Sequence, residues 1–406
     1  MMSTTSTHAA DSSAPQRLLS RDFLAICVGQ FFGFTAQGLA NPIFPLYMVA
    51  QGQTETYIGF ALAAFNVISF VVRPTFGGMV DAGQPRKAMS VAGAFMALGP
   101  LGYLVPNPWL VFAVRGVHGV GWAGVNVSGS AWVAYLAPAN RRAEALGYYT
   151  MAQRVGNFAG PVVGLWLANN VGFNEAFLAS GFCGLCVLLT SLAARSGAVT
   201  AATPGKAADE PQRSWLLRWV EPGAFLGASL LVLNTIPGVV VVAYMPLYYL
   251  KIGLGGIELY FVVLGIMGIF ARGLIGRWAD KIGRMRAIGS GFLIQFIGLS
   301  AFTLTQDPLL LMLGGAVWIF GSGLSQPSLY ALAIDRAPPN RRGKAMATYT
   351  MAFQVGGGIG AITGGVILEQ LGFPALHLAM AGTALAGVLI VVFGVRGKLR
   401  PVASPT

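Results

Sequence analysis

The sequence predicts an all-α membrane protein with twelve transmembrane helices arranged as two pseudo-symmetric six-helix bundles. Three observations lead to this fold class: the composition, the spacing of the apolar segments and an internal repeat. Of the 406 residues, 55% are hydrophobic and 10% are charged, whereas about a quarter of an ordinary soluble chain is charged. A soluble core cannot hold that much apolar surface, so we expect the chain to lie in a membrane.

The formal net charge of +12 does not indicate a nucleic-acid partner, because the basic residues flank the apolar segments and form no single binding face. All three cysteines lie inside apolar runs, which argues against a disulfide framework. The sequence shows no metal-ligand cluster, nucleotide-binding loop or nucleophile elbow. We therefore expect no enzyme, no bound metal and no cofactor.

Twelve apolar segments are long enough to cross a bilayer, whose core of about 30 Å needs about 20 residues of helix. The predicted spans are 22–48, 56–80, 88–105, 109–136, 144–168, 175–195, 222–249, 257–280, 287–304, 309–335, 344–368 and 374–395. By composition, the predicted domains are a disordered cytoplasmic tail at 1–20, a first bundle at 21–195, a polar linker at 196–221, a second bundle at 222–396 and a second cytoplasmic tail at 397–406.

The basic residues between the spans predict the orientation of the chain. Lys251 is the only Lys or Arg that we place on one side, where the loops carry Glu55, Glu175, Glu258, Asp307 and Glu369. The other side has both tails and Arg86, Lys87, Arg141, Arg142, Lys281, Arg284, Arg286, Arg341, Arg342 and Lys344. Because basic loops stay in the cytoplasm, we expect both termini on the cytoplasmic face of the cell inner membrane.

A repeat with an offset of 200 residues divides the spans into two sets of six. Asn140-Arg-Arg142 and Tyr149-Thr-Met-Ala152 recur as Asn340-Arg-Arg342 and Tyr349-Thr-Met-Ala352. The glycines at 156, 160 and 164 recur at 356, 360 and 364. A duplicated six-helix unit explains both the repeat and the number of spans.

Three motifs resemble those of a known family: Gly276-Arg-Trp-Ala-Asp280-Lys-Ile-Gly-Arg284, Arg115-Gly-Val-His118-Gly119 and Gly156-Asn-Phe-Ala-Gly160-Pro161-Val-Val-Gly164. They are similar to motifs A, B and C of the major facilitator superfamily, and the chain resembles its 12-helix drug and metabolite:proton antiporters. In the first half motif A is degraded, because Pro85 stands where Arg is expected. The resemblance implies the major facilitator fold and, through motif C, export.

The motif A residues are expected to form a cytoplasmic gate. Asp280 can pair with Arg284, and the resemblance implies that it works with a carboxylate at the end of the tenth span, here Asp335. Asp81 holds the matching position in the first half, where Tyr135 stands in place of the second carboxylate. Such contacts exist only while the cytoplasmic side is closed. The alternative is that these are ordinary loop charges.

The glycines of motif C share one stripe of the fifth span, where they let a neighbouring backbone approach closely. Gly156, Gly160 and Gly164 suit helices that slide against each other, and static packing explains them equally well. Pro161 lacks a backbone donor and is expected to bend this span.

Polar residues that differ between the halves are the better candidates for a transport site, because shared positions hold the scaffold. Arg115, His118 and Arg154 lie roughly 10 to 15 Å inside the predicted membrane edges, with no carboxylate at that depth. A deep Arg costs about 2.5 to 3.5 kcal/mol, so it normally faces a cavity or a partner. The resemblance implies that the first, fourth, seventh and tenth spans line a central cavity. The predicted cavity residues are Arg115, His118, Trp122, Asn126, Gln30, Gln37, Asn41, Arg154, Asn234, Tyr244, Trp318 and Gln326.

Each of these residues has an alternative role. Arg115 could hold helix ends through backbone carbonyls, and Arg154 could reach toward the membrane surface or cap a carbonyl near Pro161. His118 could be a neutral, hydrogen-bonded side chain. The amides of the first span could join neighbouring helices.

The leading hypothesis is a monomeric, proton-coupled exporter of a small amphipathic or anionic metabolite or drug that works by alternating access. His118, with an unperturbed pKa of about 6.5, is the predicted proton carrier. Two deep arginines without acids favour an anionic substrate. The alternatives are an uptake symporter or uniporter for an organic anion, and a non-transporting membrane receptor or assembly partner.

Overall fold

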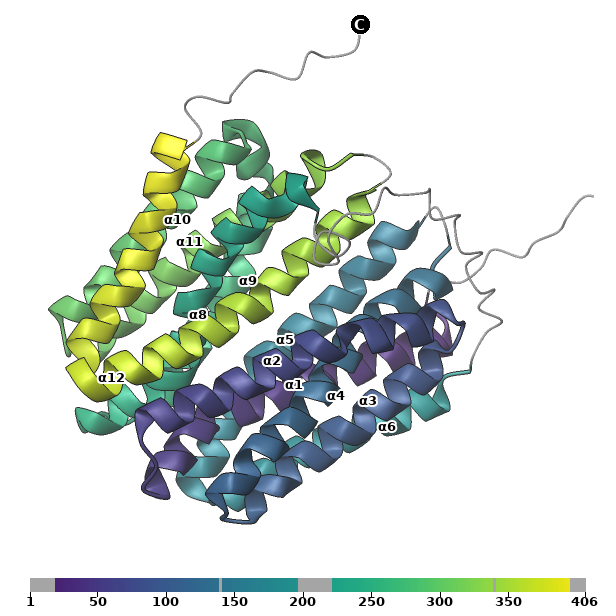
Figure 1. The fold of residues 1–406 in the computed structure, drawn as a ribbon, viewed down its shortest axis with the longest axis horizontal. Coiled ribbons are helices and arrows are strands. Elements are labelled where there is room, and N and C mark those ends of the chain that lie inside the picture. The colour runs from purple at the N-terminus through teal and green to yellow at the C-terminus, as the bar shows by residue number, and fades with distance from the viewer. Residues whose placement is uncertain (1–18, 139–140, 196–220, 339–340, 395–406) are drawn as a thin grey trace, which may run out of the picture.

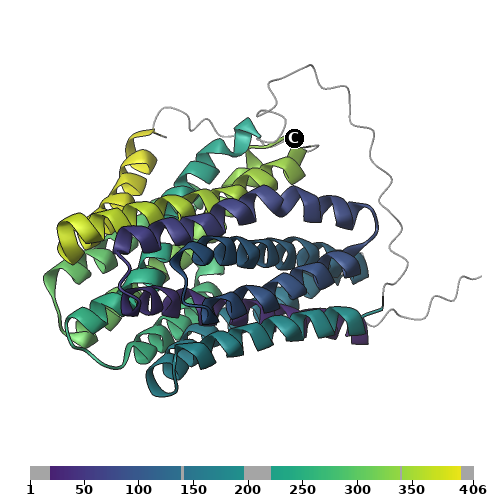
Figure 2. The ribbon, with the colours of Figure 1, turned by 60° about the horizontal axis from the view of Figure 1, so that its bottom comes forward.

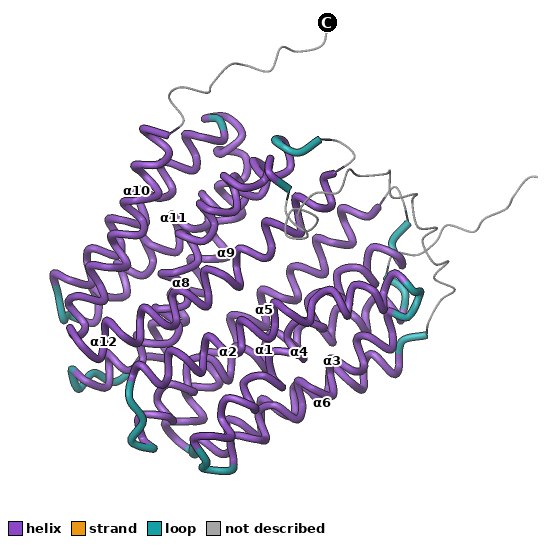
Figure 3. Tube along the Cα trace, viewed as in Figure 1, coloured by secondary structure: helices purple, strands orange, loops and turns teal. Residues whose placement is uncertain are grey.

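The computed structural model describes residues 19–138, 141–195, 221–338 and 341–394. Within these ranges the regular structure is helical, with short turns between the helices (Figure 3). The first half contains α1 Arg21–Ala50, α2 Glu55–Asp81, α3 Pro85–Leu101, the 3-10 turn η1 Gly102–Leu104, α4 Pro108–Leu136, α5 Arg142–Asn170 and α6 Phe173–Ala193. The second half contains η3 Pro222–Ala224, α8 Phe225–Lys251, α9 Ile257–Ile282, α10 Arg284–Leu304, α11 Pro308–Asp335 and α12 Arg342–Gly394. The predicted tails and linker fall almost entirely outside the described residues.

The first ten predicted spans each match one helix to within a few residues. The last two, 344–368 and 374–395, lie on either side of Gly372 in α12, where a φ of 79° and a ψ of −179° interrupt the helix. Glycine adopts this conformation readily because it has no Cβ. Eight of the described helical elements are long and apolar enough to cross a membrane. The count of twelve spans therefore stays a prediction.

Polar side chains in the loops begin several of these helices. Ser20 accepts a hydrogen bond from the Phe23 N–H at 3.2 Å at the start of α1, and Asp307 accepts one from the Leu310 N–H at 3.0 Å at the start of α11. Thr54 caps α2 in the same way. These caps satisfy backbone donors that the first turn of a helix leaves unpaired.

The two halves occupy separate sides of the molecule, the first purple to teal and the second green to yellow (Figure 1). A second view shows the same bundle of long helices from another side (Figure 2). We call the end where α1 begins the linker end, because Arg195 lies there and its N–H donates to Asp22 at 2.9 Å. The opposite end, where α1 ends and α2 begins, is called the far end.

The motif C glycines pack α5 against α1 within the first half. A Cβ added at Gly156 would lie 2.3 Å from the Phe31 carbonyl oxygen, and one at Gly160 would lie 2.6 Å from the Cα of Gly38. The contact continues through Pro161 against Gly38 and Gly164 against Leu39. The repeated Gly356 packs α12 against α8 in the second half. These glycines therefore bring helices of the same half together.

The halves meet closely toward the far end. The Thr56 N–H donates to Glu369 Oε2 at 2.9 Å, joining the start of α2 to α12. Farther along the same pair of helices, a Cβ added at Gly59 would lie 2.5 Å from the Ala361 carbonyl oxygen. Backbones that approach so closely leave no passage between α2 and α12, so this side of the far end is closed.

Candidate functional site

A cavity of ≈ 130 Å³ lies between the two halves, and we call it the interhalf cavity. It is enclosed by α1 and α2 of the first half and α8 of the second. None of the described residues that line it is charged: they are Asn41, Leu62, Phe65, Asn66, Gly238, Val239, Val242 and Ala243. Two amides in an otherwise apolar wall provide a few directional hydrogen bonds within a surface suited to an apolar ligand.

Arg115 is fully buried inside the first half, in a cage of aromatic rings. Its guanidinium carbon lies 3.6 Å from the centre of the Phe44 ring, 5.6 Å from that of Tyr103 and 5.9 Å from that of Phe65. All three of its side-chain nitrogens lack a hydrogen-bond partner among the described residues. A desolvated cation–π contact contributes about 2 kcal/mol or more. This contribution offsets much of the cost of a deep guanidinium.

His118 is also fully buried, between α2 and α3. Its ring meets the Phe65 ring edge-on, with 5.5 Å between centres, and its Cβ lies close to Gly99 of α3. Both ring nitrogens lack a hydrogen-bond partner among the described residues. One stripe of α4 thus carries both deep bases, but neither lines the interhalf cavity in this conformation. Asn126, farther along this stripe, donates to a carbonyl one turn earlier at 2.9 Å.

The predicted residues of α1 differ in their surroundings. Gln30 is fully buried and donates to a carbonyl of α4 at 3.3 Å, as its alternative role between helices requires. Gln37 donates to Asn41 at 3.0 Å, and Asn41 lines the interhalf cavity. The Phe34 ring packs edge-on against Trp122 of α4, with 4.8 Å between centres.

The predicted residues of the second half form contacts within that half. Asn234 is buried and donates to the Ser325 hydroxyl at 2.8 Å. Tyr244 donates to a carbonyl of α12 at 2.9 Å. Trp318 is buried, and the Gln326 carbonyl accepts from a tyrosine hydroxyl of α12 at 3.0 Å. A role of these four residues in a cavity stays a prediction.

Arg154 and its repeat counterpart have different surroundings. Arg154 is half-buried on α5, and the structure gives it no hydrogen bond or ion pair within the described ranges. Gln354 is buried and donates to the Ser69 hydroxyl of α2 at 2.5 Å, across the boundary between the halves. At equivalent positions of the repeat, the first half therefore has a cation, and the second half has a glutamine that bonds to the first half.

At the linker end, Arg284 and Asp335 form an ion pair that joins the start of α10 to the end of α11. Both side chains are about half exposed, and such pairs contribute at most about 1 kcal/mol. Asp81 is exposed at the end of α2, without an ion pair in the described part of the chain. The side chain of Asp280 lies outside that part. The pair links two helices of one half, and a gate between the halves stays a prediction.

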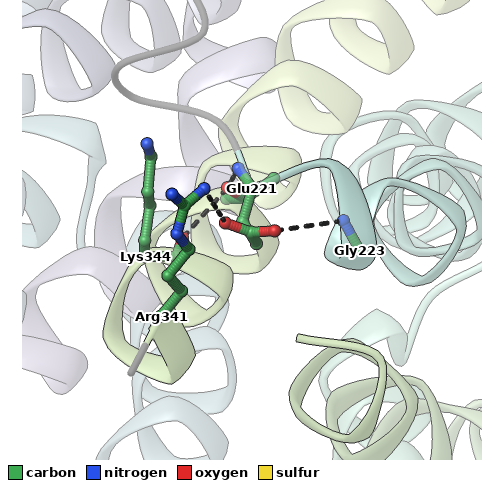
Figure 4. A network of polar contacts seen from close by, with 5 residues as sticks. Glu221, Gly223, Arg341 and Lys344 are labelled. Carbon is green, nitrogen blue, oxygen red and sulfur yellow. Dashed lines mark hydrogen bonds and ion pairs between the residues drawn. The ribbon is translucent and has the colours of Figure 1, made fainter. Parts of the chain in front are cut away.

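A second polar network holds the start of the second half (Figure 4). Glu221 is buried, its N–H donates to the Thr348 hydroxyl at 2.9 Å, and its carboxylate accepts from the Gly223 N–H at 3.5 Å. The other carboxylate oxygen lies 3.8 Å from Arg341, with Lys344 beside this pair. The network ties the residues before α8 to the first turns of α12. The sequence analysis missed Glu221, because its burial depends on the packing of α12.

Two carboxylates near helix ends accept hydrogen bonds from neighbouring residues. Arg141 donates to both carboxylate oxygens of Glu144, at 2.7 and 2.8 Å. The Thr56 backbone N–H, followed by the hydroxyls of Thr56 and Thr54, lowers the pKa of Glu369. Because Glu369 belongs to the second half and Thr56 to the first, this second contact favours the closed far end.

Phe65, Asn66 and Ser69 are further site residues that the sequence analysis missed. Phe65 and Asn66 line the interhalf cavity, and Ser69 contributes the bond between the halves. Asn66 is a polar residue in the middle of the apolar run 56–80, which is a usable signal. The family resemblance implies a cavity lined by the first, fourth, seventh and tenth spans, and Asn66 lies in the second.

Two repeated helical halves that enclose a cavity at their boundary are typical of a secondary membrane transporter. The family profile of the Major Facilitator Superfamily matches residues 26–307 and 269–406, and the chain belongs to this superfamily. It is therefore a multi-pass membrane transporter and not an enzyme.

Similar proteins include drug efflux proteins. The chain is 25% identical to the multi-drug resistance efflux pump PmrA homolog of Lactococcus lactis, over 92% of this chain and 94% of that protein. It is 22% identical to the quinolone resistance protein NorA of Staphylococcus aureus, over 92% and 96%. Its fold is similar to that of the xylose transporter XylE from E. coli, with a TM-score of 0.74 and 16% identity over 94% and 96%.

Proposed function

We propose that this chain exports a small amphipathic or anionic metabolite or drug in exchange for protons, by alternating access to a site between the halves. The observation that carries the proposal is the interhalf cavity, which lies beside the closed contact of α2 with α12. The two relatives named for drug efflux and quinolone resistance support the outward direction. We place the protein in the cell inner membrane, with the linker end in the cytoplasm.

Phe65 connects the interhalf cavity to the buried cation. Its ring lines the cavity and lies 5.9 Å from the Arg115 guanidinium. An uncharged cavity wall is thus backed by a positive charge in a medium of low dielectric constant, where charges act strongly. This favours substrates that combine an aromatic or apolar body with a negative charge. A rotation of Phe65 would bring the guanidinium within reach of such a substrate.

The substrate class is tested by transport of an anionic and a cationic aromatic compound of similar size into proteoliposomes. We expect Arg115→Gln to lower transport of the anion at least tenfold and to spare the cation. Arg21→Gln removes an exposed charge at the linker end and is the matched control. Undiminished anion transport by a folded Arg115→Gln protein would reject an anionic substrate.

We assign the proton to His118, because an imidazole has an unperturbed pKa of about 6.5 and this one lies deep in the first half, on the same stripe of α4 as Arg115. His118→Gln keeps a polar side chain of similar length and removes the titration. We expect it to flatten the dependence of transport on pH between about 5.5 and 7.5. If the variant transports as well as the wild type with the same pH profile, another group carries the proton.

The direction of transport requires a sided experiment. In inverted membrane vesicles with an acidic interior, a proton-coupled exporter accumulates its substrate inside. An uptake symporter for an organic anion loses substrate from the same vesicles and accumulates it in intact cells. Accumulation in cells alone would replace the export proposal with the uptake alternative.

A further inference from the structure

A larger cavity of ≈ 430 Å³ lies at the far end of the second half, separate from the interhalf cavity. It is lined by the ends of α8 and α10, by the residues that follow α10, and by the part of α12 just after the kink at Gly372. Its wall combines the rings of Tyr248, Phe302 and Phe373 with two basic side chains, Lys251 and His377. Neither the transport cycle nor the family motifs account for this group.

Lys251 gives the cavity a positive charge. It is the last residue of α8 and exposed, and its ammonium lies 5.4 Å from the centre of the Phe373 ring. No ion pair is found for it within the described ranges, and Asp307, which follows the cavity residue Gln306, caps α11. Because Lys251 is the only Lys or Arg predicted on this side of the membrane, its charge is not explained by the positive-inside rule.

His377 adds a hydrogen-bond acceptor. Only 3% of this residue is exposed, and its Nδ1 lies 2.9 Å from the Phe302 carbonyl oxygen. A carbonyl only accepts, so Nδ1 carries the proton, and this bond satisfies one of the carbonyls left unpaired at the end of α10. In the neutral ring Nε2 is then an acceptor, with no protein partner among the described residues. The bond to the end of α10 explains the role of Nδ1, but it gives no role to Nε2 as an acceptor.

The surroundings of the cavity are apolar and exposed. Leu304, which lines the cavity, is 83% exposed. Leu371, beside the kink of α12, and Leu250, near the end of α8, are 68% and 61% exposed. Exposed leucines of a membrane protein contact acyl chains, and aromatic rings collect at the boundary between lipid and water. The cavity therefore lies where a lipid headgroup meets its chains.

We propose that this cavity binds an anionic phospholipid whose headgroup carries hydroxyls, such as phosphatidylglycerol. The phosphate contacts Lys251, a headgroup hydroxyl donates to His377 Nε2, and an acyl chain follows Leu304. A choline headgroup has no hydroxyl to donate, and its cation repels Lys251. The site therefore selects phosphatidylglycerol over phosphatidylcholine.

Native mass spectrometry of the full chain in detergent, titrated with phosphatidylglycerol or phosphatidylcholine, tests the proposal. We expect Lys251→Gln to weaken binding of the first bound phosphatidylglycerol about fivefold and to leave phosphatidylcholine unaffected. His377→Asn retains a donor for the Phe302 carbonyl and lacks Nε2, and it should also weaken phosphatidylglycerol. Lys87→Gln, which removes the same charge at the linker end, is the control and should bind normally. Thermal unfolding without lipid establishes that each variant is folded.

Three results would overturn the proposal. Equal phosphatidylglycerol binding by wild type and Lys251→Gln would show that the lipid does not bind at this cavity. An equal loss in Lys87→Gln would show a general effect of charge. Displacement of the lipid by millimolar inorganic phosphate or glycerol 3-phosphate would make the occupant a soluble anion.

Discussion

Closure of the far end depends on a close approach of two backbones, which the substitution Gly59→Ala perturbs. The added Cβ would lie 2.5 Å from the Ala361 carbonyl oxygen. Carbon–oxygen contacts settle near about 3.3 Å, so α2 and α12 would have to separate by about 0.8 Å at this point. Overpacking of this kind costs about 1 to 3 kcal/mol. The contact exists only while the far end is closed, so the cost falls on the closed conformation.

A penalty of about 1 to 3 kcal/mol shifts an equilibrium about 5- to 150-fold. Gly59→Ala is therefore expected to raise the population with an open far end by at least about fivefold. Gly78→Ala is the matched control, because it lies in the same helix and an added Cβ there meets no atom within 4 Å. Both substitutions change helix propensity equally, so only the contact with α12 differs.

Cysteine labelling measures this population. Asn41→Cys places a thiol in the interhalf cavity, in a protein whose native cysteines are replaced with alanine. A membrane-impermeant maleimide is added at the far side of proteoliposomes, and the labelling rate follows the open fraction. We expect faster labelling for Gly59→Ala and an unchanged rate for Gly78→Ala. Equal rates in the two variants would refute closure by this contact.

Three further predictions concern other contacts. The pKa of Glu369 is lowered in the closed conformation, so its contact with α2 favours closure above the ordinary pKa of 4.5 and loses this effect as the pH falls. Because the maleimide reacts with the thiolate, rates are compared at one pH: Glu369→Ala should label faster than the wild type at pH 7, and this difference should shrink at pH 4. A double-mutant cycle of Phe44→Leu and Arg115→Met should show about 1 to 2 kcal/mol of coupling in thermal unfolding, and additive effects would contradict the stacking. Gly156→Ala should lower the Tm in detergent, whereas Gly147→Ala, with no atom within 4 Å of its added Cβ, should not; equal losses would show that the contact of α1 with α5 is not tight.

The fold was predictable because the length of an apolar run depends only on local composition and on the thickness of the bilayer. The repeat then paired the glycines of 156–164 with those of 356–364, and the structure places both sets at the same helix contact within each half. The sequence places Asp335 in one group with Asp280 and Arg284, and the structure pairs it with Arg284, because α10 begins and α11 ends at the linker end.

The site was predictable only in part. Spacing along α4 placed Arg115 and His118 on one stripe, which is a property of the helix alone. Their enclosure by Phe44, Phe65 and Tyr103 depends on which helices cover that stripe, and no local pattern specifies this.

The amino-acid sequence by itself predicted which segments enter the membrane and which polar residues are deep, and it shows the internal repeat. Only the tertiary structure showed that the interhalf cavity has an uncharged wall with its cation behind Phe65, and that Glu221 and His377 are buried. The physical reason is that burial and cavity shape arise from contacts between segments far apart in the chain, whereas apolar length and helical period are local.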